Sequence, residues 1–476
     1  MSDPIPPPGS PGRLERLAVR FTAWSERWIP DAFVFALVAT LLVLAAGLLA
    51  TPAGPLELVR SWGKGFWELI PFTLQMALVI ITGYVLASSR PVLRAITWLA
   101  GRPRTDRGAA VLVALFAMLT SWLNWGFSLI FSAILAREVA RRRPGCDYRV
   151  LAAASFLGLG SVWAQGLSGS AALQMTTPGA LQPAIREVIA HGGLVPGGLV
   201  PLRHTIFLWQ SLVSVLVEIA VVLLVIWLVT PVGPRARTAA QLGVRLDPPA
   251  AGDGPPRPRA PGEWLEHSPL LTALVVLVGG LYLADRFATA ADPLLAIDLN
   301  TINLAFLLLG FALHGTPARL MRAFREATPA VWGVILQFPF YAGIAGVIVY
   351  TGLNERIAAF FVSISSPESF PALIAMYSTG LGVFVPSGGS KWVIEAPYVM
   401  AAAHDLRVHL GWMVAVYDLG EALANLVQPF WMLPTLALLG LRARDVMGFT
   451  LLVFLVLTPV VLLLVTLLGL TLAYPL

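Results

Sequence analysis

A break in an otherwise apolar stretch reads Phe384-Val385-Pro386-Ser387-Gly388-Gly389-Ser390-Lys391-Trp392. A second polar break, Ser121-Trp122-Leu123-Asn124-Trp125-Gly126-Phe127-Ser128, lies in the other half of the chain. Irregular backbone at membrane depth persists only where protein or a water-filled cavity satisfies its polar groups. Paired breaks in two halves of a membrane chain are typical of the binding site of a secondary transporter.

The composition agrees with a membrane location for both breaks. Hydrophobic residues make up 57% of the 476 residues and charged residues only 12%, and the mean hydropathy is +0.78. Soluble domains carry about 25% charged residues. At roughly 20 apolar residues per span, we expect an all-α polytopic membrane protein with about nine full spans. These spans are expected near 31–51, 68–88, 150–184, 205–230, 268–287, 297–314, 330–350, 408–440 and 446–474.

Several function classes are disfavoured by the same residues. The net charge of +6 does not indicate nucleic-acid binding, because the positive residues fall in loops and form no basic patch with interleaved aromatics. The lone Cys146 excludes a disulfide within the chain and a thiolate metal cluster, and we expect it to be inert. The six histidines form no H-E-x-x-H motif, residues 166–170 fail G-x-S-x-G, and residues 387–391 lack P-loop spacing. We therefore expect no enzyme, no metal site and no cofactor.

Arginines in short loops predict the topology. Arginine clusters at 90–107 and 137–149 flank the first break, and such clusters stay on the cytoplasmic side. Residues 108–140 are therefore expected to form a re-entrant hairpin that enters and leaves on that side. The N-terminal tail, 1–30, is then cytoplasmic. The span at 268–287 has no partner in the first half, so it inverts the orientation of the later spans and places the C-terminus outside.

This topology divides the chain into two inverted repeats. The first, 31–230, holds the hairpin 108–140 and a broken helix at 150–184. A cytoplasmic linker, 231–267, is rich in Pro, Gly and Arg and is expected to be poorly ordered. An extra span, 268–296, precedes the second repeat, 297–476, with its hairpin 371–403 and its broken helix 408–440.

Two short amphipathic stretches support the repeat. Residues 53–67 and 317–332 each precede a span and place apolar residues at three- and four-residue spacing beside Arg. That pattern indicates helices lying in the membrane interface. The alternative is a pair of ordinary loops.

Each hairpin is followed by a long span with a polar break, which we expect at 165–178 in the first half and at 417–429 in the second. Aligning Pro178 with Pro429 pairs Gly169 with Gly420 and Ser170 with Glu421.

Broken helices supply the chemistry of the predicted site. Free N–H groups at helix N-termini suit a carboxylate, and freed carbonyls at C-termini suit a cation or a proton carrier. The residues expected to bind substrate are Asn124, Trp125, Gly126, Ser168, Gly169, Ser170, Ser387, Gly388, Gly389, Ser390 and Lys391. Those expected to couple a cation or proton are Glu421, Gly420, Asn425, Thr176 and Thr177.

Structural interpretations stay open for the same residues. Gly and Ser in membrane helices often serve close helix packing, and Asn124 could be a hydrogen-bond donor between helices. Trp125 and Trp392 could anchor helices at the interface. Lys391 could form an ion pair with Glu421, or an i, i+4 pair with Glu395. Thr176 and Thr177 could simply begin the next helical piece.

Seven short motifs together resemble the short-chain fatty acid transporter family of the acetoacetate-utilisation type, within the ion transporter superfamily. They are Trp62-Gly63-Lys64-Gly65-Phe66-Trp67, Gln75-Met76-Ala77-Leu78, Asn124-Trp125-Gly126-Phe127, Ala136-Arg137-Glu138-Val139-Ala140-Arg141-Arg142, Phe338-Pro339-Phe340-Tyr341-Ala342-Gly343-Ile344, Val385-Pro386-Ser387-Gly388-Gly389 and Gln428-Pro429-Phe430-Trp431. The resemblance is close to full length.

The resemblance implies uptake of short monocarboxylates, such as acetoacetate or butyrate, across the bacterial inner membrane. From the chemistry of the breaks we expect symport with H⁺ or Na⁺. Analogy with the superfamily implies an elevator mechanism and a homodimer. Glu421 after Gly420 matches the family, whereas the family also carries His at the position of Lys391 and Gln at that of Glu395. A carrier for dicarboxylates or aminoacyl compounds is the alternative within transport. An ion channel, or a membrane scaffold without transport, is the alternative outside it.

Overall fold

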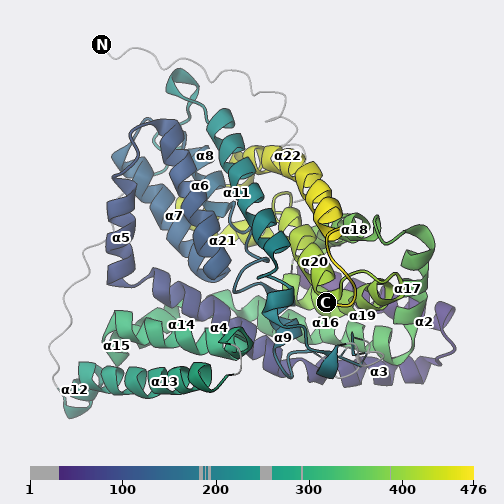
Figure 1. The fold of residues 1–476 in the computed structure, drawn as a ribbon. Coiled ribbons are helices and arrows are strands. Elements are labelled where there is room, and N and C mark those ends of the chain that lie inside the picture. Colours follow the sequence, from purple (N-terminus) through teal and green to yellow (C-terminus); the bar gives the residue numbers. More distant parts are fainter. Residues whose placement is uncertain are drawn as a thin grey trace, which may run out of the picture.

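The computed structural model describes residues 32–181, 186–187, 189–190, 195–246, 260–290, 293–385 and 387–476. The expected tail, 1–30, lies outside the described residues, and so does Pro386. The described residues form α-helices and single turns of 3₁₀-helix, with no β-strand among them (Figure 1). The prediction of an all-α chain is confirmed.

The helices fall into two sets. The first set is α2 (Ala32–Ala50), α3 (Pro55–Glu68), α4 (Ile70–Ala87), α5 (Arg90–Ala100), α6 (Asp106–Leu123), α7 (Trp125–Arg142), α8 (Tyr148–Phe156), α9 (Ser170–Thr176) and α11 (Trp209–Val229). The second set is α12 (Pro261–Glu266), α13 (Pro269–Thr289), α14 (Leu299–His314), α15 (Pro317–Ala327), α16 (Trp332–Tyr350), α17 (Leu353–Ile364), α18 (Phe370–Phe384), α19 (Gly388–Asp405), α20 (Leu410–Ala424), α21 (Leu433–Leu439) and α22 (Ala443–Gly469). Single 3₁₀ turns are η2 (Pro196–Gly198), η3 (Leu202–His204), η4 (Gly233–Arg235), η5 (Pro293–Ala296), η6 (Thr328–Ala330) and η7 (Phe430–Met432).

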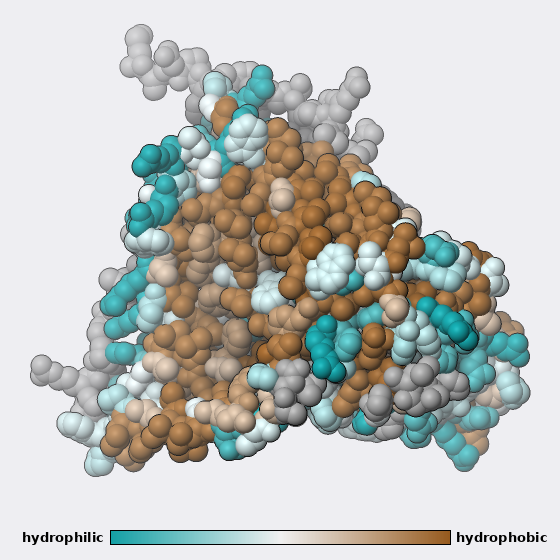
Figure 2. Space-filling model, in the orientation of Figure 1, coloured by the Kyte–Doolittle hydropathy of each residue, from teal (hydrophilic) through white to brown (hydrophobic). Residues whose placement is uncertain are grey.

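Six of the described helices are long and apolar enough to cross a membrane: α4, α6, α11, α13, α16 and α22. Shorter apolar helices include Ala36–Ala50 and Leu299–His314. A broad apolar surface covers α11 and α22 (Figure 2), where leucines such as Leu216 and Leu463 are exposed. The chain is therefore a multi-pass membrane protein, whereas the expected count of nine spans is not confirmed by these lengths.

The element order of the first set recurs in the second. The series α2 to α5, the α6–α7 pair, the interrupted α8 and α9, and α11 is followed by α14 to α17, the α18–α19 pair, the interrupted α20 and α21, and α22. Contacts cross between the series in matching ways, because α3 packs against α16 and α15 packs against α4. Outside this scheme lies α13, which packs mainly on α14 and leaves most of its side chains exposed.

Local capping explains where the first hairpin turns. Thr105 accepts a hydrogen bond from the N–H of Gly108 and starts α6. Asn124 has extended backbone angles, and its Oδ1 accepts from the N–H of Phe127 at 2.8 Å, so it ends α6 and caps α7. The two helices pack side by side. In the second half Val385 ends α18 and Ser387 precedes α19.

The polar breaks of the two long spans overlap the predicted breaks only in part. In the first half the irregular backbone is 157–169, whereas residues 170–176 of the predicted break are helical. In the second half the break is 425–429, so Gly420 and Glu421 lie inside the regular helix α20. The alignment of Pro178 with Pro429 is therefore wrong. The alignment failed because Gly and Ser show only where a helix is able to break. Packing with other helices determines at which of these positions it does break.

Two other expectations concern segments beside the spans. Most of 53–67 lies in α3 and most of 317–332 lies in α15, so the loop alternative is wrong. The start of the linker is ordered, because the N–H of Arg237 donates to the Asp147 carboxylate at 2.9 Å and Arg137 donates to the Arg245 carbonyl. The expectation of poor order is wrong for these residues, whereas 247–259 lie outside the described part.

Candidate functional site

A small cavity lies where both breaks and the hairpin tips meet. Its walls come from α4, the start of α7, the irregular segment 157–169, α9, α16, the start of α19, the break 425–429 and η7. The lining residues are Met76, Ile80, Trp125, Leu159, Trp163, Ser170, Val334, Phe338, Ser387, Gly388, Gly389, Asn425 and Trp431. Six of these were predicted from the sequence to be site residues: Trp125, Ser170, Ser387, Gly388, Gly389 and Asn425.

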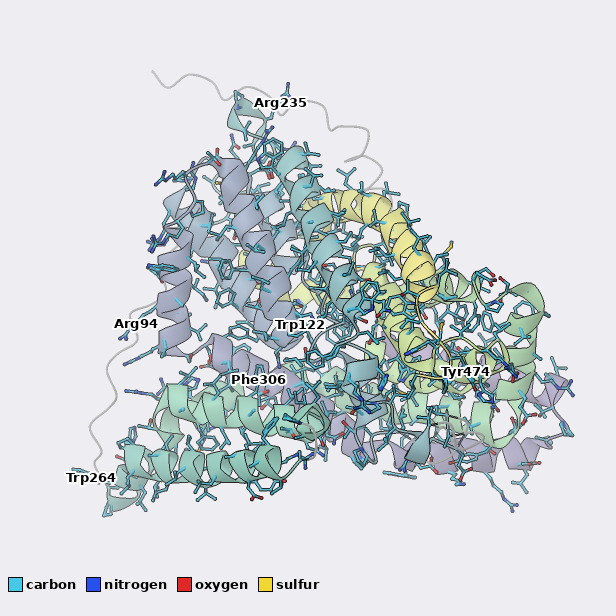
Figure 3. All side chains as sticks on the ribbon, viewed as in Figure 1. Arg94, Trp122, Arg235, Trp264, Phe306 and Tyr474 are labelled. Carbon is cyan, nitrogen blue, oxygen red and sulfur yellow. The ribbon has the colours of Figure 1, made fainter. Side chains whose placement is uncertain are left out.

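The first hairpin tip is held to the irregular segment by two hydrogen bonds. The N–H of Trp125 donates to Oγ of Ser168 at 2.9 Å, and the N–H of Leu167 donates to the Trp122 carbonyl at 2.7 Å. Trp122 lies near the middle of the molecule, well away from Arg94 and Arg235 at its edges (Figure 3). Asn124 is buried and caps the helix, so its carbonyl oxygen is already used. The tip thus presents the Trp125 side chain to the cavity.

Glycines allow this tip to sit close to its neighbours. A Cβ on Gly166 would lie 2.1 Å from the Trp122 carbonyl oxygen, and one on Gly169 would lie 1.9 Å from that of Ala164. Gly126 is less tight, with 3.3 Å to the backbone of Ile80. The packing interpretation therefore describes Gly169 well, and neither Gly126 nor Gly169 lines the cavity.

The second tip places the N-terminus of α19 at the cavity. Gly388 and Gly389 begin the helix, and the N–H groups of a first helical turn have no partner within the helix. Their carbonyls are bound, since Gln174 Nε2 donates to the Gly389 carbonyl at 2.8 Å and Tyr417 donates to that of Gly388. Ser387 donates to Oγ of Ser390. Backbone donors at a helix N-terminus favour an anion.

A buried ionic cluster lies directly behind this tip. Lys391 Nζ is 2.6 Å from Oε2 of Glu421 and 3.5 Å from Oε1 of Glu395, and it donates to the Ser378 carbonyl at 2.6 Å. Glu395 also accepts a hydrogen bond from Ser378. Both ion pairs that the sequence left open are therefore present together. Two carboxyl groups share one ammonium, so the cluster carries a net charge of −1 when all three are ionised.

The cluster adjoins the cavity without lining it. A Cβ on Gly388 would meet Cγ of Glu421 at 3.2 Å on one side and the Trp163 ring at 2.8 Å on the other. Asp418, one turn earlier in α20, faces the backbone N–H groups of Ala171 and Ala172 at the start of α9. Lys391 is fully buried among these partners, which favours its structural interpretation over direct contact with substrate.

The remaining predicted residues are spread around the site. Gly420 lies against α18, where a Cβ would be 2.4 Å from the Ala375 carbonyl oxygen. Asn425 joins the two breaks by donating to the Leu159 carbonyl at 3.0 Å. Thr176 and Thr177 end α9 rather than begin a helix, and Thr177 Oγ1 accepts from the N–H of Leu299. Neither threonine lines the cavity.

The other lining residues of the cavity, and Glu218, were not predicted from the sequence. Trp163, Phe338 and Trp431 supply aromatic walls, and the Trp125 ring packs edge-on against both Trp163 and Trp431. Phe338 and Trp431 belong to the Phe338–Ile344 and Gln428–Trp431 motifs, so the sequence offered a reason to predict them as site residues. Glu218 is buried in α11 and accepts from Gln165 Nε2 at 2.6 Å. A single carboxyl within an apolar span was a usable sequence signal for it.

The chain has a multi-pass helical fold with two helical hairpins beside a small cavity. Two solved structures share it: the Alcanivorax borkumensis YdaH transporter, with a TM-score of 0.59 and 16% identity, and Neisseria gonorrhoeae MtrF, with 0.60 and 12%. The alignments cover 92% of this chain and 98% of the first, and 94% of this chain and 97% of the second. At these identities the likeness shows the fold alone.

Sequence comparison identifies the family. A profile described as short chain fatty acid transporter matches residues 13–468. An Escherichia coli (strain K12) protein is 38% identical over 92% of this chain and 95% of its own length. A Haemophilus influenzae protein is 33% identical over 92% of this chain and 96% of its own length. Both are named "Putative short-chain fatty acid transporter". The chain belongs to the short-chain fatty acid transporter family, and the resemblance drawn from its motifs is confirmed.

Proposed function

We propose that the protein is a secondary active transporter that takes up short-chain monocarboxylates, such as butyrate and acetoacetate, across a bacterial inner membrane. The observation that carries this proposal is the cavity between the two hairpin tips. It combines an apolar wall with backbone N–H groups at the start of α19. Membership of the family supports the same substrate class.

The two kinds of wall suit the two ends of the substrate. The carboxylate is bound by the N–H groups of Gly388 and Gly389, in the positive field of the helix N-terminus. The alkyl chain lies against Met76, Ile80 and Phe338. Each buried CH₂ group contributes about 0.8 kcal/mol, so a small cavity favours short chains over formate and excludes long ones by size.

The lining favours one carboxylate over two. None of the described lining residues is Lys, Arg or His, and the nearest ammonium, that of Lys391, is held by Glu395 and Glu421. A dicarboxylate would bring a second charge into a site with no second cationic group. Burial of an unpaired charge is costly, so the dicarboxylate alternative is disfavoured.

Transport is proposed to follow an elevator mechanism coupled to H⁺ or Na⁺. The recurring element order is consistent with inverted repeats, with the α6–α7 and α18–α19 pairs entering from opposite sides. The N-terminus is then cytoplasmic and the C-terminus outside. The exposed apolar side chains of α13 offer a surface for lipid or for a second copy in a homodimer.

The test is uptake of labelled butyrate, acetate and acetoacetate by purified protein in liposomes, with pH and sodium gradients imposed separately. We expect saturable uptake under one of the gradients, exchange of external for internal butyrate, and little competition by succinate. No uptake of any of the three acids under either gradient would overturn the proposal. Uptake that does not saturate and shows no exchange would indicate a channel instead.

A further inference from the structure

A lone carboxyl group lies in the middle of α11. Glu218 is the only charged residue of this helix, and its side chain is 1% exposed. At a rise of 1.5 Å per residue, each end of α11 lies roughly 15 Å from it. An ionisable side chain at such depth in an apolar span is by default a functional candidate, because an unneeded charge there would be strongly disfavoured.

Glu218 has no countercharge among the described residues. The helices that pack most against α11 are α6 and α22. The charged residues of α6, Asp106 and Arg107, stand at its start, as do Arg444 and Asp445 of α22. The Arg107 guanidinium stacks over Trp227, nine residues along α11 from Glu218. The irregular segment 157–169 contains no ionisable residue. Glu218 thus differs from Glu421 and Glu395, which share Lys391.

Gln165, the one polar partner of Glu218 among the described residues, is able to serve both of its protonation states. Gln165 Nε2 donates to Glu218 Oε1 at 2.6 Å, whereas Gln165 Oε1 is buried with no hydrogen-bond partner in the part of the chain that the structure describes. A carboxylate only accepts hydrogen bonds, and a carboxylic acid also donates one. Rotation of the amide would present its free oxygen to a protonated Glu218. Gln165 Oε1 is therefore the acceptor that a protonated Glu218 needs.

Gln165 is tied to the candidate substrate site by a short stretch of backbone. It lies three residues before Ser168, which accepts from the N–H of Trp125, and two before Leu167, which donates to the Trp122 carbonyl. Trp125 lines the cavity. A change of partner at Gln165 would therefore move the segment that positions the first hairpin tip.

We propose that Glu218 is the group that binds and releases the coupling proton, an inference that rests on the proposed transport of monocarboxylates. A proton from the outer side adds to the Glu218 carboxylate with substrate bound, and the same O–H bond breaks on the inner side. No other bond changes. The protonated Glu218 is neutral, so α11 carries no charge while the substrate moves across the membrane.

The test compares net uptake with exchange in liposomes for wild type, Glu218→Gln and the matched control Glu368→Gln, whose carboxyl is exposed. Exchange of internal for external butyrate needs no net proton movement, whereas net uptake does. We expect Glu218→Gln to lower proton-driven net uptake by about tenfold or more while exchange stays within about twofold of wild type. Glu368→Gln should change neither.

The outcomes separate the inference from the function on which it rests. Wild-type protein that transports no short-chain acid refutes the proposed function. Wild-type protein that transports them, with Glu218→Gln retaining full proton-driven uptake, refutes the role of Glu218 alone. A folded variant that loses exchange and net uptake equally also overturns it, because Glu218 would then be needed for binding or structure. Proton uptake on adding butyrate to protein in weak buffer gives a second readout, which Glu218→Gln should abolish.

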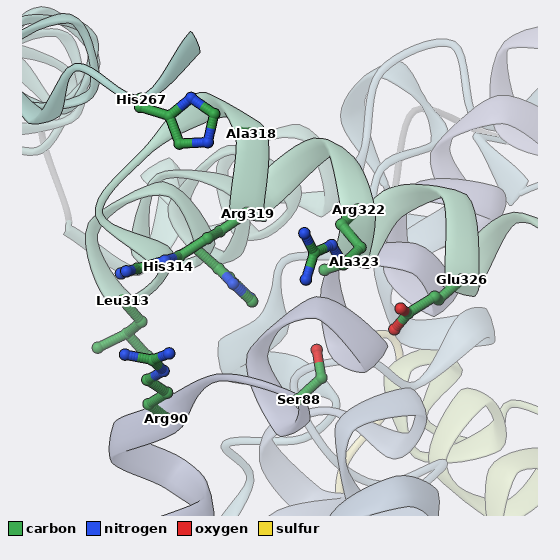
Figure 4. Close-up of a pocket in the computed structure, with 10 residues that line it drawn as sticks. All are labelled: Ser88, Arg90, His267, Leu313, His314, Ala318, Arg319, Arg322, Ala323 and Glu326. Atoms are coloured by element: carbon green, nitrogen blue, oxygen red, sulfur yellow. The ribbon is translucent and has the colours of Figure 1, made fainter. Parts of the chain in front are cut away.

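A different observation concerns a second cavity, which Figure 4 shows. It lies between the start of α5, the ends of α12 and α14, and α15. Arg90, Arg319 and Arg322 surround it with His267 and His314, and Glu326 is the one carboxylate among its described lining residues. With both histidines neutral, three guanidinium groups and one carboxylate give a charge of +2.

The three arginines of this cavity are available to a ligand. In the described part of the chain, no carboxylate forms an ion pair with Arg90, Arg319 or Arg322, although the structure contains ion pairs elsewhere. The residues around this cavity are of the kinds found at the lipid interface. Trp264, three residues before His267, is exposed, and the adjoining α13 exposes Leu274 and Leu277. Tryptophan anchors and basic residues gather at headgroup depth.

We infer that this cavity binds the phosphate headgroup of an anionic phospholipid, such as phosphatidylglycerol. Guanidinium groups bind phosphate oxygens in pairs of hydrogen bonds, and the apolar face of α13 accepts the acyl chains. This site is independent of the proposed transport function. A free phosphate would find the same arginines but no partner on α13.

The test is the thermal unfolding temperature of purified protein in detergent with phosphatidylglycerol, phosphatidylcholine or inorganic phosphate added. We expect a rise of several degrees with phosphatidylglycerol only, lost in Arg319→Gln/Arg322→Gln and retained in the control Arg356→Gln, an exposed arginine of α17. Equal effects of the two lipids, or an unchanged response of the double variant, would overturn the site. A rise produced equally by inorganic phosphate would refute the lipid and indicate a soluble phosphate ligand.

Discussion

Nζ of Lys391 lies 2.6 Å from Oε2 of Glu421, and both side chains are buried between α19 and α20. This pair joins the second hairpin to the interrupted span behind it. Glu395 shares the same ammonium at 3.5 Å. The charges are thus arranged to hold the wall of the candidate site, while the cavity itself is lined by neutral groups.

Removing one partner of this pair should destabilise the protein more than removing both. Lys391→Met leaves two buried carboxyl groups without their ammonium, which costs about 3 to 5 kcal/mol. Lys391→Met combined with Glu421→Gln removes most of that mismatch. We expect the double variant to unfold at a higher temperature than Lys391→Met in detergent. If the double variant lost as much stability as Lys391→Met and Glu421→Gln lose together, direct coupling of the pair would be contradicted.

The transport role of Glu421 is testable with the same proteins. If Glu421 carries the proton, Glu421→Gln should lose uptake driven by a pH gradient and keep exchange. Since its carboxyl is engaged by Lys391, we expect Glu421→Gln to impair exchange and net uptake together, as a change in the site wall would. Retention of full proton-driven uptake would rule out Glu421 as the proton carrier.

A methyl group added at Gly389 should obstruct the cavity. Its Cβ would lie 3.0 Å from the Phe72 ring and 3.3 Å from Cβ of Ser170. Overpacking of this kind costs about 1 to 3 kcal/mol. Where that cost falls on the substrate-bound state, KM for butyrate rises roughly 5- to 150-fold. The matched control is Gly380→Ala in α18, where a Cβ meets nothing within 4 Å. Equal KM values for the two variants would contradict the cavity as the binding site.

Loss of the Ser168 hydroxyl should loosen the first hairpin tip. Ser168→Ala leaves the buried N–H of Trp125 without its acceptor, at a cost of about 1 to 3 kcal/mol. Ser132→Ala is the control, because the Ser132 hydroxyl is equally buried and has no hydrogen-bond partner among the residues that the structure describes. We expect a lower unfolding temperature and weaker butyrate uptake for Ser168→Ala only. The bond would be unimportant if both variants behaved like wild type.

Cys146 should be unreactive in the folded protein. Burial raises the pKa of its thiol to about 12, with the Asp106 carboxylate adding to the rise, so the thiolate is scarce at pH 7 to 9. A maleimide should label it only after denaturation. Gly145→Cys with Cys146→Ser moves the thiol to an exposed neighbouring position and should label readily. Rapid labelling of native wild-type protein at pH 7 would contradict the burial of this loop.

Local signals in the sequence were sufficient for the class of fold and for the hairpin tips. Composition alone indicates a helical membrane protein, because few charged residues remain to be solvated. Asn124 predicts a turn since its short side chain is able to cap the next helix, and it does so. Ser387, Gly388 and Gly389 likewise mark a helix start at the cavity. These features depend on neighbours within a few residues.

Packing between distant segments decided the rest. The break of the first long span begins at 157 rather than 165. Its backbone is held there by contacts with Trp122 and Asn425, which are distant in sequence and therefore give no local signal. The same reason explains why Lys391 has carboxylate partners on two helices and why Gln165 meets Glu218. A sequence shows which residues are able to bind an ion, a proton or a carboxylate. Which of them satisfy one another instead is determined only when the helices are brought together.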